Sequence, residues 1–168
     1  VLLLMWEKAW DFIRRAFTII FVATIVIWFL QHFDAKLNVV PSDSTTSLLS
    51  IIGMWMAPVF APLGFADWRV VTSLVTGLMA KEAVVSTLGV LLNVGTDALA
   101  GAIAGLFTMR SALSFLTFAL LYTPCVAAIS TIKRELGSTV KTIEVVVSQC
   151  CVAWLTAYIV YLIAGIIL

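Results

Sequence analysis

The sequence has little charge. Only 11% of its 168 residues are Asp, Glu, Lys or Arg, whereas about 25% is usual for a soluble domain. A soluble fold of this length needs more charge to cover its surface, so the composition excludes most soluble and disordered chains. Ten basic residues nearly balance nine acidic ones. The chain therefore lacks the basic patch of a nucleic-acid-binding protein, and no nucleic acid is expected as a partner.

Cysteine, histidine and catalytic motifs are scarce as well. Three cysteines without a CxxC pair form neither a disulfide framework nor a zinc site. The sequence also lacks the GxSxG, HExxH and GxxxxGK[ST] motifs of serine hydrolases, zinc proteases and nucleotide-binding loops. We therefore do not expect this chain to be an enzyme by itself.

Hydrophobic residues make up 62% of the chain, and its mean hydropathy is +1.13. Five long apolar regions predict about five membrane crossings, because each suffices for a hydrocarbon core of about 30 Å. These regions are 16–33, 44–66, 70–96, 111–132 and 145–168. We therefore predict an all-α, polytopic transmembrane domain over residues 1–168. Because the chain begins with Val1 and has no signal peptide, we expect it to be part of a longer protein.

Basic residues favour one side of the predicted membrane. If the five segments alternate in direction, most basic residues fall on one side, which identifies that side as cytoplasmic and places the N-terminal end there. The first group is Lys8, Arg14, Arg15, Arg69, Lys133, Arg134 and Lys141, and the other is Lys36 and Arg110.

Prolines interrupt two of the predicted spans. Pro58 and Pro62 lie in region 44–66, and Pro124 lies in region 111–132, where its missing N–H leaves the Leu120 carbonyl available. Irregular backbone survives in a bilayer only where protein or a water-filled cavity satisfies it, and broken helices often supply ion sites in transporters. We therefore expect helix breaks at Pro58 and Pro62, with simple kinks as the alternative.

Two charges, Lys81 and Glu82, interrupt region 70–96. If residues 70–94 form one helix, Glu82 lies about 20 Å along the axis from Arg69, near the bilayer midplane. An ionisable group there is costly and is usually functional. Glu82 then shares a small, polar face with Ser86, which suits an ion path or a close helix contact. The alternatives are a buried charge network that fixes helix packing, or a break in the helix that lets both charges reach water.

The segment Tyr122-Thr123-Pro124-Cys125 carries further candidate ligands. Thr123 and Cys125 place an oxygen and a sulfur beside the carbonyl freed by proline. A thiol, carbonyls and the Glu82 carboxylate form a ligand set that suits transient binding of a borderline divalent cation such as Fe²⁺. The alternative is that Cys125 only fills space beside a kink. The role of Cys150 and Cys151 stays open, because neighbouring side chains diverge on a helix.

Several motifs extend this interpretation to almost the whole chain. They lie within 6–16, 51–65, 67–89 and 112–135, and the most specific are Ala80-Lys81-Glu82 and Tyr122-Thr123-Pro124-Cys125. In these segments the sequence resembles the ferrous iron transport protein B family. The resemblance implies a bacterial inner-membrane importer of Fe²⁺, with an N-terminal GTPase domain and a helical membrane domain that contains two gate segments.

By this resemblance the chain is the C-terminal membrane part with the second gate, and the GTPase domain and first gate lie outside it. GTP and Mg²⁺ then bind only to the missing domain, and Fe²⁺ is the transported ion. Cys125 becomes a pore or gate thiol, and Lys81 and Glu82 become candidates for the ion path or its switching network.

We therefore predict that the chain forms part of the ion path of a GTP-dependent Fe²⁺ uptake transporter. The expected partners are membrane lipid and the missing GTPase domain, and homo-oligomerisation is left open. Two alternatives remain: a permease for nucleosides or other small solutes, and a non-transporting membrane assembly subunit. The predicted path or gate residues are Thr123, Pro124, Cys125, Lys81, Glu82 and Ser86, with Cys125 and Glu82 as metal ligands.

Overall fold

The computed structural model describes residues 2–41, 44–78, 81, 83–122 and 125–167. Over these residues the protein is built of helices, with two isolated β-bridges, which confirms the predicted all-α fold. The helices are α1 Leu2–His32, α2 Leu48–Phe60, the 3₁₀ helix η1 Ala61–Leu63, α3 Trp68–Gly77, α4 Ala83–Leu91, α5 Thr96–Leu106, α6 Met109–Leu121, α7 Val126–Leu136 and α8 Thr139–Ile167.

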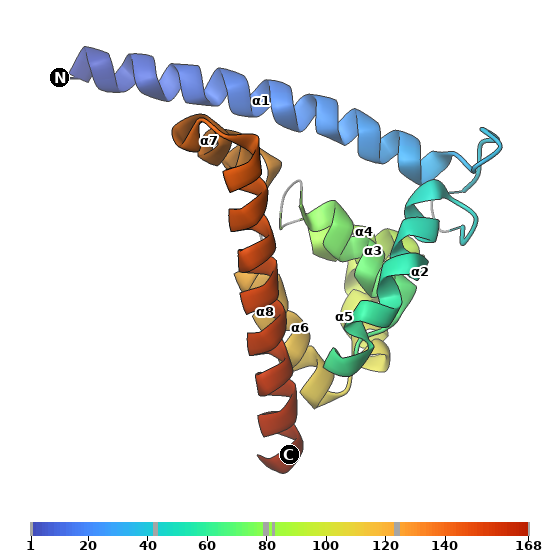
Figure 1. Cartoon of the computed structure of the whole chain (residues 1–168). Coiled ribbons are helices and arrows are strands. Elements are labelled where there is room, and N and C mark those ends of the chain that lie inside the picture. The colour runs from blue at the N-terminus through green and yellow to red at the C-terminus, as the bar shows by residue number, and fades with distance from the viewer. Residues whose placement is uncertain (1, 42–43, 79–80, 82, 123–124, 168) are drawn as a thin grey trace.

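Three helices outline the molecule. The long helix α8 forms one side and α2 forms the other, while α1 lies across one end of both (Figure 1). Between these sides, α6 packs along α8 and α3 packs against α2.

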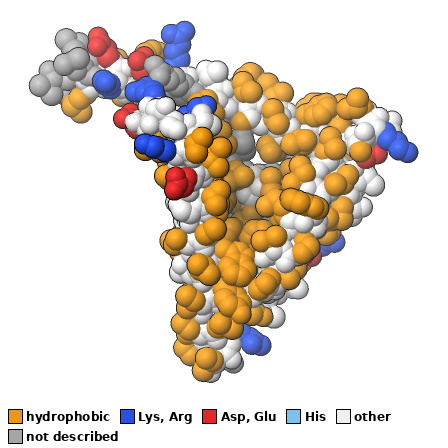
Figure 2. All heavy atoms as spheres, viewed as in Figure 1, with side chains coloured by type: hydrophobic (Ala, Val, Ile, Leu, Met, Phe, Trp, Pro, Cys, Tyr) orange, Lys and Arg blue, Asp and Glu red, His pale blue; other side chains and the backbone are white. Residues whose placement is uncertain are grey.

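The surface of the molecule is largely apolar. Figure 2 shows hydrophobic side chains over most of the visible face, with charged side chains gathered over the first half of α1 and over α7. Exposed apolar surface on this scale is typical of a protein whose surroundings are lipid or other apolar helices. On α8 alone, large exposed hydrophobic residues include Val147, Val152, Leu155, Ile159 and Ile163.

The number of candidate spans differs from the prediction of five. Within the described residues, only α8, with 29 residues, is long and apolar enough by itself to cross a membrane. Two bent pairs qualify if each counts as one span: Leu48–Leu63 with Trp68–Gly77, bent by 103°, and Asp97–Leu106 with Met109–Leu121, bent by 108°. The apolar part of α1, Phe17–His32, is shorter than 18 residues, and α1 crosses α8 instead of running beside it (Figure 1).

Region 70–94 is not one helix, so the condition on which the midplane position of Glu82 depended is not met. Helix α3 ends at Gly77 and α4 begins at Ala83. Asn93 lies beyond α4 with φ 52°. Between α3 and α4, Lys81 binds backbone carbonyls at the end of α6, as described below.

Region 111–132 is also divided, because α6 ends at Leu121 and α7 begins at Val126. A proline at position 124 has no N–H to continue the helical hydrogen bonds. In region 44–66 the outcome differs between the two prolines. Helix α2 runs through Pro58 and ends at Phe60, and Pro62 lies in η1, after which the chain bends. Pro58 was therefore wrongly predicted as a break.

Gly64 reverses the chain between η1 and α3. Its φ of 83° lies in the left-handed region, which favours glycine. Beyond it, the side chain of Asp67 accepts a hydrogen bond from the backbone N–H of Arg69 at 2.8 Å and caps α3. Segment 97–110, for which the sequence favoured neither helix nor loop, forms most of α5 and the start of α6.

The core combines aromatic rings with small residues. Phe60 and Phe118 meet edge to face with their ring centroids 5.1 Å apart, and Phe118 stacks on Tyr122 at 5.4 Å. On α8, the fully buried residues Ala153 and Ala157 allow α6 to approach closely. The hydroxyl of Ser114 on α6 donates to the carbonyl of Ala157 at 3.0 Å.

Helices α2 and α3 meet at Gly53. A Cβ atom at this position would lie 2.0 Å from the Oγ1 atom of Thr72 and 3.0 Å from the carbonyl oxygen of Trp68. Thr72 is fully buried, and its Oγ1 has no hydrogen-bond partner among the described residues. The close approach of the two helices thus excludes any larger residue at 53.

We expect Gly53→Ala to lower the free energy of unfolding by about 1–3 kcal/mol through overpacking. Thr72→Ala should be nearly neutral, because removing an unpaired buried hydroxyl offsets the lost packing. In the double variant, part of the Gly53→Ala loss should be recovered, since the contact at 2.0 Å with Thr72 Oγ1 is gone and only the Trp68 carbonyl at 3.0 Å and the Cβ of residue 72 at 3.2 Å still crowd the new methyl group. Thermal unfolding in lipid nanodiscs measures the stability of all three variants. A loss in the double variant equal to the sum of the two single losses would contradict this account.

Candidate functional site

The two helix breaks meet. The backbone N–H of Val126, at the start of α7, donates a hydrogen bond to the carbonyl of Leu78, just beyond α3, at 2.9 Å. This bond joins positions far apart in the sequence and brings the segment of Lys81 beside the segment of Cys125. The two motifs that were most specific in the sequence therefore lie at one place in the fold.

Lys81 holds the end of α6. Its Nζ atom donates to the carbonyl of Leu120 at 2.9 Å and approaches the carbonyl of Tyr122 at 3.5 Å. It also lies 5.0 Å from the centroid of the Tyr122 ring, in cation–π contact. The carbonyl end of a helix carries partial negative charge, so an ammonium group is favourable there.

Tyr122 is a buried member of the site. It is 4% exposed, and its hydroxyl approaches the carbonyl of Leu74 on α3 at 3.4 Å. The ring fits because Gly77 has no side chain: a Cβ there would lie 2.5 Å from the Tyr122 hydroxyl and 2.4 Å from Val84. Gly77 thus allows α3, α4 and α6 to converge.

Buried hydroxyls continue the site along α3. Thr76 donates to the Thr87 hydroxyl of α4 at 3.0 Å, and Ser73 donates to a carbonyl within its own helix at 2.7 Å. Sequence reasoning missed these hydroxyls and concentrated on the charges. Their signal was the run of Thr72, Ser73 and Thr76 in an otherwise apolar region.

The predicted site residues have different outcomes. Cys125 is half-buried and is the N-cap residue of α7. Ser86 lies on α4 and is exposed. Glu82, Thr123 and Pro124 lie outside the described residues, so the proposed pairing of Cys125 with Glu82 stays a prediction. Within the described part of the chain, no group of three or more His, Cys, Asp or Glu side chains is placed to hold a metal ion.

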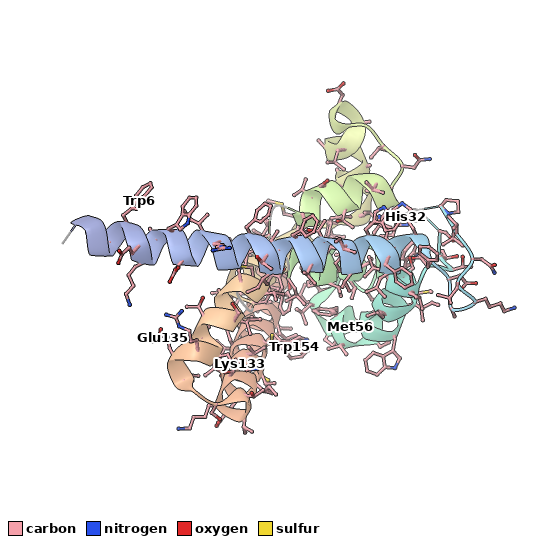
Figure 3. The ribbon with its side chains drawn as sticks, turned by 90° about the horizontal axis from the view of Figure 1, so that it is seen from above. Trp6, His32, Met56, Lys133, Glu135 and Trp154 are labelled. Carbon is pink, nitrogen blue, oxygen red and sulfur yellow. The ribbon has the colours of Figure 1, made fainter. Side chains whose placement is uncertain are left out.

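An apolar cavity of about 420 Å³ lies between α8, α6 and the α2–α3 pair, and Tyr122 and Leu78 of the site form part of its wall. Met56 and Trp154 line it from opposite helices, and both are labelled in Figure 3. The indole N–H of Trp154 donates to the carbonyl of Val59 at 3.0 Å and bridges α8 to α2. Cys150 and Cys151 also line this cavity, whose apolar walls offer little to a hydrated ion.

Fold and site together define an all-α membrane domain in which two interrupted helical segments are in contact. The Gate family model, described as nucleoside recognition, matches residues 13–139. The chain belongs to the Gate family.

The chain is also similar to proteins named Fe(2+) transporter FeoB, which confirms the resemblance found in the sequence. The chain is 38% identical over 138 residues to the relative from Methanocaldococcus jannaschii, which covers 79% of this chain and 20% of that relative. It is 36% identical over 157 residues to the relative from Staphylococcus aureus, which covers 93% of this chain and 23% of that relative. It is 33% identical over 177 residues to the relative from Campylobacter jejuni, which covers 98% of this chain and 29% of that relative. The chain thus spans less than a third of these relatives, and no solved structure matches it significantly.

Proposed function

We propose that the chain forms part of the membrane domain of a GTP-dependent Fe²⁺ uptake transporter in the bacterial inner membrane. The similarity to longer proteins named as Fe²⁺ transporters supports this proposal. In it, the chain is the C-terminal gate domain, and GTP and Mg²⁺ bind to an N-terminal domain beyond this chain. Membrane lipid and that domain are its partners.

The observation that carries a transport role is the meeting of the two breaks. Interrupted helices leave backbone carbonyls without helical donors, and such carbonyls coordinate cations in transporters. Fe²⁺ would exchange part of its hydration shell for the Cys125 thiol, nearby carbonyls and the Glu82 carboxylate. Binding at several weak sites lets the ion leave again.

The test is Fe²⁺ uptake by the full-length transporter in liposomes. Cys125→Ser and Glu82→Gln should each reduce uptake by about tenfold or more, equal to about 1.4 kcal/mol of lost stabilisation. Cys151→Ser is the matched control, because this exposed thiol lies on α8 beside the apolar cavity. Normal uptake by both site variants would reject these two residues as ligands.

A second candidate, a permease for nucleosides, is favoured by the description of the matching family. One experiment distinguishes the two functions: the uptake of labelled Fe²⁺ and of labelled nucleoside is measured in the same liposomes. Uptake of nucleoside without Fe²⁺ would reject the iron proposal. Liposomes that take up neither would favour the assembly subunit.

A further inference from the structure

Two carbonyls at the end of α6 have no backbone donor among the described residues, for separate reasons. In a continuous helix, the Leu120 carbonyl would accept from residue 124, but that residue is proline and has no N–H. The Tyr122 carbonyl would accept from Val126, but the Val126 N–H donates to Leu78. Both oxygens lie at the negative end of α6. The break therefore produces a pair of acceptors suited to a cation.

The Lys81 ammonium occupies this position. It bonds Leu120 at 2.9 Å, lies 3.5 Å from the Tyr122 carbonyl and faces the Tyr122 ring at 5.0 Å. Carbonyl oxygens and an aromatic face are the groups that receive a small cation. Cys125, a soft ligand, follows three residues after Tyr122 in the chain. An ion that entered here would meet oxygen ligands with a thiol close along the backbone.

We infer that the carbonyls of Leu120 and Tyr122, with the Tyr122 ring, form a divalent-cation site that Lys81 fills in this state. Lys81 acts as a tethered competitor: the transported cation binds when the ammonium withdraws, and the ammonium returns when the cation leaves. The inference rests on the proposed function, because the site that Lys81 fills belongs to the proposed ion path, which is closed while the ammonium is bound.

Competition has a quantitative consequence. When a site is open for only a fraction of the time, its apparent dissociation constant rises by the inverse of that fraction. If Lys81 fills the site about nine-tenths of the time, its removal should lower the apparent KM for Fe²⁺ about tenfold. A residue that only held the two breaks together would produce no such gain in affinity.

The experiment measures Fe²⁺ uptake by the full-length transporter in liposomes. Lys81→Ala should lower the KM about tenfold, whereas Lys81→Arg, which keeps the charge and the donors, should retain the wild-type value. The matched control, Lys133→Ala, removes an exposed lysine of α7 and should leave the KM unchanged. Methylammonium should raise the KM of Lys81→Ala toward the wild-type value and should not affect the wild type.

An unchanged or raised KM in Lys81→Ala, without an effect of methylammonium, would overturn the inference. If Lys81→Ala does not fold, Lys81→Met keeps the aliphatic stem and should show the same fall in KM. If the wild type carries no Fe²⁺, the proposed function fails by itself. Equilibrium binding of Mn²⁺, followed by electron paramagnetic resonance, then tests the site: tighter binding to the variant supports it, and equal binding overturns it.

Discussion

Replacing Gly77 by valine is expected to destabilise the protein strongly, by about 3 kcal/mol or more. Even the first added carbon would lie 2.4 Å from Val84 and 2.5 Å from the Tyr122 hydroxyl. Neither neighbour can easily move, because Val84 is 5% exposed and Tyr122 is 4% exposed. The added side chain would push α4 and α6 away from α3.

A glycine on α5 provides the matched control. Gly101 has no atom within 4 Å of an added Cβ, and alanine is favoured over glycine within a helix by about 0.5–1 kcal/mol. Gly101→Ala should therefore preserve or slightly raise stability. Thermal unfolding in nanodiscs and Fe²⁺ uptake measure both variants. Equal unfolding midpoints for Gly77→Val and Gly101→Ala would show that the three helices do not converge as described.

Replacing Tyr122 by alanine should cost about 3–5 kcal/mol, as is usual for removal of a large buried side chain. The ring stacks on Phe118 with centroids 5.4 Å apart and supports the Lys81 ammonium. Phenylalanine keeps both contacts and removes only a hydroxyl that lies 3.4 Å from its acceptor, Leu74. Because this distance is long for a hydroxyl donor, Tyr122→Phe should cost less than about 1 kcal/mol.

Thermal unfolding of the two Tyr122 variants tests whether the ring or the hydroxyl is important. A loss in Tyr122→Phe as large as in Tyr122→Ala would assign the main role to the hydroxyl bond. The Fe²⁺ KM adds an independent measurement, since Tyr122→Phe leaves the aromatic face and both carbonyls in place.

Part of the site could be predicted from single residues. The missing N–H of proline at 124 was enough to identify the Leu120 carbonyl as available, and Lys81 binds that carbonyl. The same reasoning failed at Pro58, because a helix tolerates a proline when its neighbours accommodate the freed carbonyl, and α2 continues through it. Local chemistry thus located candidate breaks without deciding which of them end a helix.

The number of spans could not be predicted in this way. Apolar length is a property of a segment, whereas a bend of 103° or 108° between neighbouring helices depends on what packs into the bend. At Gly64 the left-handed backbone turns the chain, and at Lys81 a side chain binds carbonyls at the end of α6. Both outcomes depend on contacts between distant parts of the chain.

By itself, the sequence determined that this protein is an all-α membrane domain, because low charge and long apolar regions are compatible with little else. It also determined which residues depart from that apolar rule. Only the tertiary structure decided that the segments of Lys81 and Cys125 meet, through the bond from Val126 to Leu78. The physical reason is that a broken helix must find donors and acceptors elsewhere, and their positions depend on how the other helices pack.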